Sequence, residues 1–337
     1  MPDLDLADLP GAFVVSLDFE LLWGVRDRIG SQDAYMENII GARQAVPRLL
    51  ALFEGFEIAA TWAIVGCLFA TSRAELEAFT PKVRANYTDQ KLSPYEETVG
   101  EGEWEDPLHF AWSLIELIQN SPRQEIATHT FSHYYCGERG QDHKTFRADL
   151  EAACGIAARR GLKVRSIVFP RNQHNPLYDD ILLENEITAY RGNPVSSAWS
   201  FANGTEGRMA GKRMRRLLGA YIDIGGPQTL RWNEVLQPNG LSNVRASTLL
   251  RPFRPSLRPL EPLRLRRIKQ GINHAAKNRE IFHLWWHPHN FGSYIDENLD
   301  FLRKILSEVH RCQREHGMIS LSINGVDEMV HRISTVQ

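Results

Sequence analysis

Residues Glu125 to Tyr135 read Glu-Ile-Ala-Thr-His-Thr-Phe-Ser-His-Tyr-Tyr, so two histidines follow directly after a short apolar run. His129 and His133 are four positions apart, which is about one turn of a helix. On a turn or helix that opens after a strand, both imidazoles face the same side and can hold one metal ion. The alternative is a pair of unrelated surface or core histidines, so the metal hypothesis needs a further ligand from elsewhere in the chain.

The best source of that ligand is the N-terminal region. A catalytic zinc site typically has three protein ligands and one open position, and a carboxylate is a common third ligand. Residues 13–17 (Phe-Val-Val-Ser-Leu) have the short, β-branched, apolar character of a buried parallel strand, and they lead into Asp18, Phe19 and Glu20. Because side chains two apart on a strand share a face, Asp18 and Glu20 can both reach one site while Phe19 points away.

The rest of the chain alternates strand and helix patterns, which predicts parallel strands joined by helices. The expected strands after the first are 57–66, 125–127, 165–175 with a polar end, 187–193, 281–290 and 318–323. The expected helices are 42–53, 108–118, 145–160, 180–185 and 299–310. Polar side chains gather where these strands end, as in α/β barrels, whose active sites lie at the carboxyl ends of the strands.

Length and composition are those of an ordinary globular protein. The 337 residues suffice for one large α/β barrel or two average domains, with 43% hydrophobic residues, 24% charged residues and a net charge of −2. The four cysteines are scattered without a Cys-x-x-Cys pair, which predicts free thiols in a reducing compartment. An acidic N-terminus and the lack of a long apolar run predict no signal peptide and no membrane span. We therefore expect a cytoplasmic protein.

Two stretches interrupt the alternation. Residues 71–107 are polar and irregular, as expected for an insertion or a long loop that caps the mouth of a site. Residues 204–279 are strongly basic, which indicates either a solvated surface or a positively charged approach for an anionic substrate, such as a phosphate-linked sugar or a membrane glycolipid. Basic and aromatic residues are not interleaved there, so we do not expect a nucleic-acid partner.

The expected strand at 281–290 ends in His287, His289 and Asn290. Three strand ends thus offer two acids and two pairs of histidines. One carboxylate and two histidines can hold a metal, and the remaining acid and histidine can act as general base and general acid. Such a set suits hydrolysis of an amide or ester, because a bound metal polarises the carbonyl and lowers the pKa of water from 15.7 towards about 7.

These residues resemble the polysaccharide deacetylases of carbohydrate esterase family four, chitooligosaccharide deacetylases among them. The resemblance covers most of the chain and is strongest at 16–20 (Ser-Leu-Asp-Phe-Glu), at 60–62 (Ala-Thr-Trp) with Val65-Gly66, at 129–133 (His-Thr-Phe-Ser-His) and at 284–288 (Leu-Trp-Trp-His-Pro). It implies a distorted (β/α) barrel that forms a single domain over 1–337, with insertions at about 71–107 and 204–279. It also implies removal of an N-acetyl or O-acetyl group from a sugar with the help of a divalent metal.

The resemblance assigns His129 and His133 as metal ligands. In that family the two acids of the first motif are usually adjacent and the first one is the base. Here Phe19 stands between the two acids. We expect Asp18 to be the base and Glu20 the third metal ligand, and the reverse assignment stays open.

Further roles follow from the same resemblance. Arg171, in the order Pro170-Arg171 rather than arginine before proline, is expected to orient Asp18 by a charge-assisted hydrogen bond. His287 is expected to protonate the leaving amine, and Thr130 to fix the histidine loop. The expected substrate-binding residues are Asn172, Trp286, His289 and Asn290, of which the last two have a purely structural role as the alternative.

The resemblance also implies the cofactor and the partners. A divalent metal ion is expected, with zinc the best match to nitrogen ligands. The expected substrate is an acetylated sugar or oligosaccharide, with a phosphate-linked form and contact with a membrane surface suited to the basic segment. A cytoplasmic intermediate of surface-polysaccharide biosynthesis would combine these features.

Two other functions stay open at this point. One is hydrolysis of a C–N bond in a small amide or ureide on the same fold. The other is a catalytically inactive relative that binds glycans or a partner through the same face, for which the unusual first motif is the only support.

Overall fold

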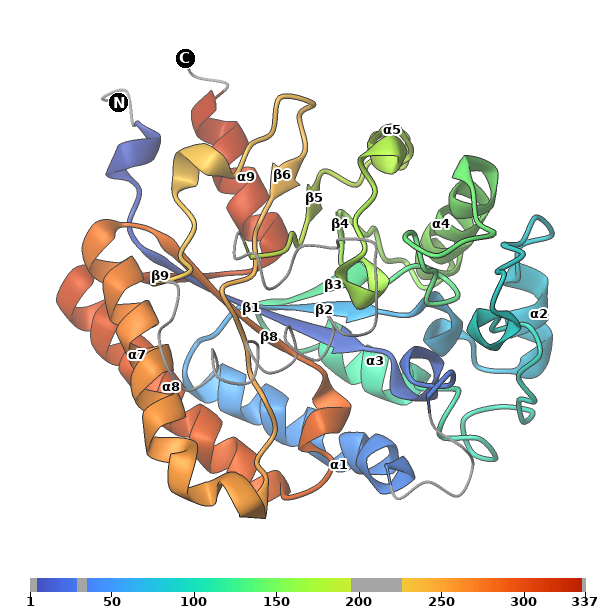
Figure 1. Cartoon of the computed structure of the whole chain (residues 1–337), viewed down its shortest axis with the longest axis horizontal. Helices are drawn as coiled ribbons and strands as arrows, with labels where there is room; N and C mark the ends of the chain where they lie inside the picture. Colours follow the sequence, from blue (N-terminus) through green and yellow to red (C-terminus); the bar gives the residue numbers. More distant parts are fainter. Residues whose placement is uncertain (1–4, 29–34, 195–225, 335–337) are drawn as a thin grey trace.

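The computed structural model describes residues 5–28, 35–194 and 226–334 of the chain. Its centre is a nine-stranded sheet in which every pairing between the strands is parallel. Figure 1 shows helices around this sheet on several sides, with α1, α7 and α8 together beneath the central strands. The strands are β1 (Ala12–Phe19), β2 (Ala60–Ile64), β3 (Gln124–Thr128), β4 (Ser166–Ile167), β5 (Ala189–Tyr190), β6 (Ser242–Asn243), β7 (Thr248–Leu249), β8 (Ile281–Trp286) and β9 (Ile319–Leu321).

The order β6-β5-β4-β3-β2-β1-β8-β7 curls the sheet into a distorted barrel, as predicted. Its two edge strands, β6 and β7, are joined by only four residues, 244–247, so the edges must lie close together. The Ala246 amide donates to Gly192 beyond β5 (2.9 Å), and the next amide, of Ser247, donates to His283 on β8 (2.8 Å). This connection therefore closes the barrel where strand pairing stops.

The centre of the sheet is β1, which pairs with β2, β8 and β9. The pleat of β1 sends Phe13, Val15, Leu17 and Phe19 into the large core beneath the outer helices. Ala12 and Val14 lie in a second apolar cluster on the opposite face, inside the barrel. The interior is thus apolar at the amino ends of the strands and becomes polar towards their carboxyl ends.

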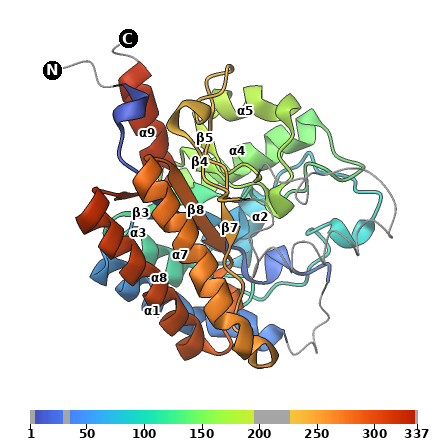
Figure 2. The same cartoon turned by 60° about the vertical axis from the view of Figure 1, so that its left-hand side comes forward.

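Helices cover the outside of the sheet. Figure 2 shows α7 and α8 running side by side across β8. The eight α-helices of the described residues are α1 (Met36–Gly55), α2 (Arg73–Phe79), α3 (Trp112–Gln119), α4 (His143–Arg159), α5 (Asp179–Glu184), α7 (Glu261–Asn278), α8 (Ile295–His316) and α9 (Ile323–Ser334). Local sequence explains several ends: Asp142 and Thr145 form a capping box before α4, and Gly317 ends α8 with φ of 67°.

The two predicted insertions differ in content. Residues 71–107 contain α2 and a 3₁₀ turn, Gln90–Leu92, but no strand of the sheet. Residues 204–225 of the predicted basic insertion lie outside the described part of the chain. The described remainder, 226–279, supplies β6, β7 and α7 to the sheet and its cover.

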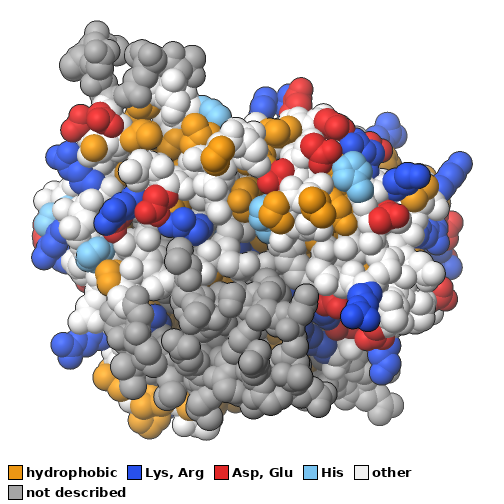
Figure 3. Space-filling view, turned by 45° about the horizontal axis from the view of Figure 1, so that its top comes forward, with side chains coloured by type: hydrophobic (Ala, Val, Ile, Leu, Met, Phe, Trp, Pro, Cys, Tyr) orange, Lys and Arg blue, Asp and Glu red, His pale blue; other side chains and the backbone are white. Residues whose placement is uncertain are grey.

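On the face in Figure 3, basic and acidic side chains are interspersed, as expected from the small net charge. Within the described ranges, none of the helices combines the length and the apolar character needed to cross a membrane.

The last helix, α9, is fixed at its start by Glu125, the first residue of the histidine stretch. The Glu125 carboxylate accepts hydrogen bonds from the Thr61 hydroxyl (2.7 Å), the Asn324 amide (3.0 Å) and the Ser166 hydroxyl. The Thr61 hydroxyl in turn accepts from the Ile323 amide (2.8 Å). Since helix N-termini carry unpaired amides and a partial positive charge, one acid joins β2, β3, β4 and α9.

We predict that Glu125→Ala lowers the free energy of unfolding by about 2–4 kcal/mol, because it leaves two hydroxyls and a helix-terminal amide without their acceptor. Urea denaturation monitored by circular dichroism would measure the loss. Glu116→Ala on the exposed side of α3 is the control and should change stability by less than about 0.5 kcal/mol. An equal, small effect of both substitutions would contradict the assigned role of Glu125.

Candidate active site

The carboxyl end of β1 delivers two acids to the barrel interior. Asp18 and Glu20 are each only 3% exposed, and Phe19 between them packs edge-on against Trp62 in the outer core, with ring centres 6.4 Å apart. The alternation expected from the sequence therefore holds in the structure.

The two histidines after β3 share a side, as expected, and the segment between them is a turn rather than a helix. His129 continues the direction of β3, and both Thr130 (φ 64°) and His133 (φ 57°) adopt the left-handed conformation, so the loop reverses rather than coils. The Thr130 hydroxyl donates to the His129 carbonyl (2.6 Å) and accepts from the Tyr134 amide (2.7 Å). Left-handed backbone at two non-glycine residues is costly, so neighbouring groups must hold the loop in place.

Asp149 on α4 provides much of that support. Its carboxylate accepts from the amides of Phe131 (2.7 Å) and Ser132 (3.2 Å) and from the Ser132 hydroxyl. Burial raises the pKa of Asp149 to about 6, although these hydrogen bonds act in the opposite direction and lower it. Asp149 was not predicted from the sequence, although an acid on the buried side of an amphipathic helix is a usable signal.

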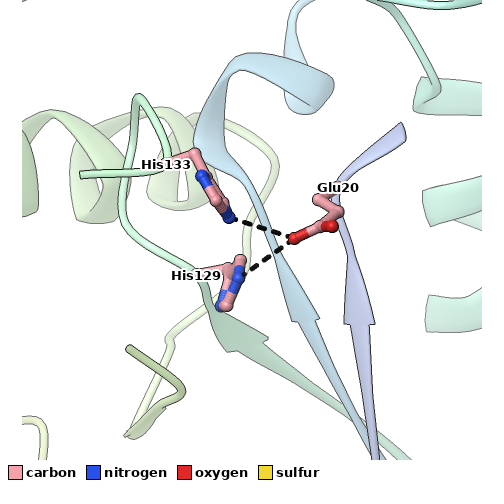
Figure 4. A group of neighbouring side chains, drawn as sticks. All are labelled: Glu20, His129 and His133. Atoms are coloured by element: carbon pink, nitrogen blue, oxygen red, sulfur yellow. Dashed lines mark ion pairs between the residues drawn. The ribbon is translucent and has the colours of Figure 1, made fainter. Parts of the chain in front are cut away.

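Glu20, His129 and His133 converge on one point (Figure 4). The Glu20 Oε2 lies 3.0 Å from the His133 Nε2 and 3.4 Å from the His129 Nε2. Ligands of a tetrahedral ion at about 2.0–2.1 Å are roughly 3.3 Å apart, so these separations suit a zinc-sized ion. The three side chains are buried.

The hydrogen bonds and charges around these groups also fit a cation. The His129 Nδ1 donates to the Val168 carbonyl (2.7 Å), which orients the ring with Nε2 towards Glu20. Burial lowers the pKa of His133 to about 4, so this ring is neutral at pH 7. Burial alone would raise the pKa of Glu20, but His287, His129 and His133 outweigh it and hold that pKa well below its usual range. Two imidazoles and one carboxylate form a known zinc ligand set.

Gly24, in the 3₁₀ turn Leu21–Gly24 that follows β1, makes room for the Glu20 carboxylate. A Cβ atom at position 24 would overlap the carboxylate carbon and both carboxylate oxygens of Glu20. Any side chain here would push Glu20 away from the histidines. The sequence analysis did not identify this glycine, because the contact forms only when the turn folds back over Glu20.

His287, just after β8, completes the group. Its Nε2 lies 3.7 Å from Asp18 Oδ2 and 3.5 Å from Glu20 Oε1, and its side chain is 25% exposed. It is thus more accessible than the three candidate ligands, as a residue that meets a substrate must be.

Arg191, rather than the expected Arg171, binds Asp18. Its two terminal nitrogens donate to the two oxygens of Asp18 (2.6 and 2.7 Å), in the bidentate geometry typical of strong ion pairs. Burial alone would raise the pKa of Asp18, but Arg191 and the nearby histidines lower it below its usual value. Arg191 occupies the carboxyl end of the β5 segment, where the sequence had indicated a polar strand end.

The predicted hydrogen bond from Arg171 to Asp18 is therefore wrong. Arg171 has a left-handed backbone (φ 54°), lies over the Tyr135 ring at 4.1 Å, and pairs with Asp27 and with Glu138 (3.0 Å). The turn at Pro170–Asn172 directs it to acids outside the group around Asp18.

Three other side chains also contact the Arg191 guanidinium. Asn172, an expected substrate contact, accepts from it through Oδ1 (2.8 Å), and the Trp285 ring lies 4.1 Å from it. Ser16 Oγ accepts from Arg191 (3.0 Å) and donates to His283 Nε2 (2.8 Å). The position of Asp18 is therefore fixed by a buried set of hydrogen bonds.

His283 is the last side chain in this set of buried hydrogen bonds, and it lies inside the barrel. Its Nδ1 donates to the Val244 carbonyl (3.0 Å), and burial lowers its pKa to about 3, so the ring is neutral and Nε2 is an acceptor. Because His283 Nε2 accepts, the Ser16 hydroxyl must donate to it, and Ser16 Oγ accepts from Arg191.

Trp286 is not placed to bind a substrate. Its side chain is fully buried in the outer core and stacks on Phe291, with ring centres 5.6 Å apart. The pleat of β8 turns Trp285 and His287 inwards and Trp286 outwards, so the predicted substrate contact of Trp286 is wrong.

His289 and Asn290 lie beside His287. His289 is buried, its ring centre is 5.1 Å from that of His287, and burial lowers its pKa to about 4. Asn290 accepts from the Tyr35 hydroxyl (2.8 Å) and contacts His287. Contact with a substrate stays a prediction for both residues.

Comparison with known proteins gives a fold but no sequence family. No family model and no curated protein matches the sequence. A Mycobacterium smegmatis protein assigned as a polysaccharide deacetylase superposes with a TM-score of 0.59 at 15% identity, over 99% of this chain and 95% of the other. The shared architecture is the distorted (β/α) barrel of the deacetylase type.

Two enzymes of glucan metabolism share the fold less closely. The α-amylase AmyC from Thermotoga maritima superposes with a TM-score of 0.54 at 11% identity, over 95% of this chain and 75% of the other. A 4-α-glucanotransferase from Thermococcus litoralis gives 0.51 at 11% identity, over 94% of this chain and 40% of the other. Since one fold carries different reactions, the side chains of the site must identify the chemistry.

We predict that Gly24→Ala weakens zinc binding at least tenfold while the protein stays folded. The backbone of residue 24 suits alanine, so the strain falls on the flexible Glu20 side chain. Competition with a chromogenic zinc chelator would measure the affinity, and thermal melting the fold. Gly55→Ala, at a position with open space around it, is the control. Unchanged zinc affinity in folded Gly24→Ala would show that Gly24 does not position Glu20.

Proposed function

We propose that the protein is a metal-dependent hydrolase that removes an acetyl group from an N- or O-acetylated sugar. The observation that carries the proposal is the convergence of a buried Glu-His-His set with a second acid, Asp18, and an accessible histidine, His287. The fold shared with the Mycobacterium smegmatis protein assigned as a polysaccharide deacetylase supports it.

Glu20, His129 and His133 would hold the divalent ion, for which zinc best suits the ligand set. When bound there, the ion would polarise the substrate carbonyl and promote loss of a proton from water. Asp18 is the less suitable ligand, because Arg191 occupies both of its oxygens whereas Glu20 faces the two histidines. This difference supports Asp18 as base and Glu20 as ligand, rather than the reverse.

Asp18 would accept the proton from the attacking water. Arg191 keeps its carboxylate ionised and in a fixed orientation. His287 would donate from Nε2 to the leaving nitrogen or oxygen, since this atom faces both acids and its ring is partly exposed. The two groups lie 3.7 Å apart, so both can reach the atoms around one carbonyl.

For the substrate, we propose an acetylated, phosphate-linked sugar that is a cytoplasmic intermediate of surface-polysaccharide biosynthesis. The four cysteines are free thiols, which supports a reducing compartment. Arg254, Arg258 and Arg266 are exposed on the segment that leads into and forms α7, which supports an anionic substrate or a membrane surface nearby. Assays on a small amide and on unmodified glycans would test the two other functions.

Zinc binding by variants of Asp18 and Glu20 distinguishes the roles of the two acids. Zinc should bind wild type and Asp18→Asn with equal stoichiometry, whereas Glu20→Ala should lose it, because Glu20 supplies one of three ligands. Atomic absorption after dialysis against zinc would measure this. Loss mainly in Asp18→Asn would reverse the two roles. Failure of wild type to bind zinc would reject a metal-dependent hydrolase.

The activity prediction concerns acetate release from N-acetylated oligosaccharides and from phosphate-linked N-acetylated sugars. Asp18→Asn and His287→Ala should each lower kcat by about 10²–10⁴-fold, the usual contribution of a general base or acid. Release of new reducing ends instead of acetate would indicate a glycosidase, and wild-type rates in either variant would reject its role.

Arginine substitutions provide a matched comparison in the same assay. Arg191→Lys removes the bidentate hydrogen bonds to Asp18 and should lower kcat at least tenfold. Arg171→Lys alters an arginine that pairs with acids outside the group around Asp18 and should have the smaller effect. The opposite ranking would restore Arg171 as the residue that orients the base.

A further inference from the structure

The rings of the two candidate histidine ligands are held in different ways. The His129 Nδ1 donates to the Val168 carbonyl, the kind of hydrogen bond that usually orients a metal-binding histidine. His133 has no counterpart to it, because within the described part of the chain its buried Nδ1 has no hydrogen-bond partner. Its Nε2 nevertheless faces Glu20 at 3.0 Å. The rotation of the His133 ring must therefore be fixed by packing.

Tyr135, two residues further along the chain, provides this packing. The ring centres of His133 and Tyr135 are 5.1 Å apart and their planes lie at 89°, which is a favourable edge-to-face geometry. The His129 ring also lies beside His133, at 5.0 Å, but it is itself a candidate ligand. Tyr135 thus supports His133 from outside the candidate ligand set. Because Tyr135 is fully buried, it is not placed to meet a substrate.

The Tyr135 side chain is in turn held by charged groups. The Arg171 guanidinium lies 4.1 Å from the centre of the ring, and that of Arg26 lies 5.5 Å from it, so both attract the ring as cations. Asp27 links the ring to Arg171, because its Oδ1 accepts from the Tyr135 hydroxyl (3.3 Å) and its Oδ2 pairs with Arg171. Rotation of Tyr135 would break these contacts together.

The neighbours of this group also have partners. The Tyr135 amide donates to the hydroxyl of Tyr87 in the 71–107 stretch (2.9 Å), and the two rings lie 5.9 Å apart. Glu138 accepts a hydrogen bond from Arg171 (3.0 Å). The backbone of Tyr135 and the cation over its ring are therefore both fixed in place.

We infer that Tyr135 is a positioning residue for His133, and that Arg171 and Asp27 hold Tyr135 in this place. The inference rests on the proposed function, since it takes His133 as a ligand of the divalent ion. A ring that rotates freely directs its nitrogen at the ion only part of the time, so loss of the Tyr135 ring should weaken metal binding. Arg171 then acts on the metal ligands, not on Asp18.

Zinc affinity, measured by competition with a chromogenic chelator, tests the inference. Tyr135→Leu removes the aromatic ring and should lower the affinity about 10–100-fold, the usual cost of losing a group that orients a metal ligand. Tyr135→Phe keeps the ring and loses only the hydroxyl, so it should stay within about threefold of wild type. Arg171→Met removes the cation over the ring and should give an intermediate loss.

Cobalt(II) in place of zinc provides a second readout, because its visible absorption depends on the geometry of its ligands. Tyr135→Leu saturated with cobalt should show shifted or weaker bands, whereas Tyr135→Phe should show the wild-type spectrum. A role in stability alone would lower the melting temperature and leave both the spectrum and the zinc affinity unchanged.

Two control variants match the changes in size and charge. Tyr178→Leu removes another buried tyrosine, which stacks on Phe146 with ring centres 4.7 Å apart. Arg147→Met removes another ion-paired arginine, whose partner is Glu184 on α5. Both controls should keep the zinc affinity within about twofold of wild type. Circular dichroism would establish that each variant is folded.

Wild-type zinc affinity and an unchanged cobalt spectrum in folded Tyr135→Leu would overturn the inference. So would an equal loss of affinity in Tyr135→Phe or in Tyr178→Leu, because the Tyr135 ring would then not be the cause. Wild-type affinity in Arg171→Met would remove Arg171 from the role. A wild-type protein that binds no zinc would reject the proposed function as well, which distinguishes the two failures.

Discussion

The pleat of β1 is the constraint on which the rest of the site depends. Side chains two apart on a strand share a face, so the same eight residues supply both the outer core and the polar interior of the barrel. Parallel pairing with β2 and β8 fixes the height of Asp18 and Glu20 relative to the ends of those strands. A shift of one residue would exchange Phe19 with the two acids and remove the site.

Placing charges inside a barrel has a cost that the structure must offset. Moving a carboxylate or guanidinium out of water costs several kcal/mol per ion. The pairing of Asp18 with Arg191 is bidentate, and Asn172, Ser16 and Trp285 contact the remaining parts of the guanidinium. Within the described part of the chain, Glu20 pairs with imidazoles and not with an arginine. This contrast between two acids on one strand supports different roles for them.

The fold alone does not identify the reaction. The barrel is shared with proteins named for deacetylation and for glucan chemistry, at identities of 11–15%. The buried Glu-His-His set is the feature that favours metal-dependent hydrolysis, since one carboxylate and two imidazoles form a known zinc ligand set.

The sequence by itself determined strands β1 to β5, β8 and β9, the inward pair of Asp18 and Glu20, and the pairing of His129 with His133, because these depend on local periodicity and spacing. It did not predict β6, β7, α2, α7 or α9, of which β6, β7 and α7 lie in the stretch expected to be an insertion. Only the tertiary structure decided that Arg191 and not Arg171 meets Asp18, that Trp285 and not Trp286 faces the interior, and that Gly24 makes room for Glu20. These contacts depend on how the sheet curls and where left-handed turns reverse the chain. Arg191 and Asp18 lie far apart in sequence, so no local pattern records their pairing. Gly24 lies only four residues from Glu20, but the two meet because the turn after β1 folds back.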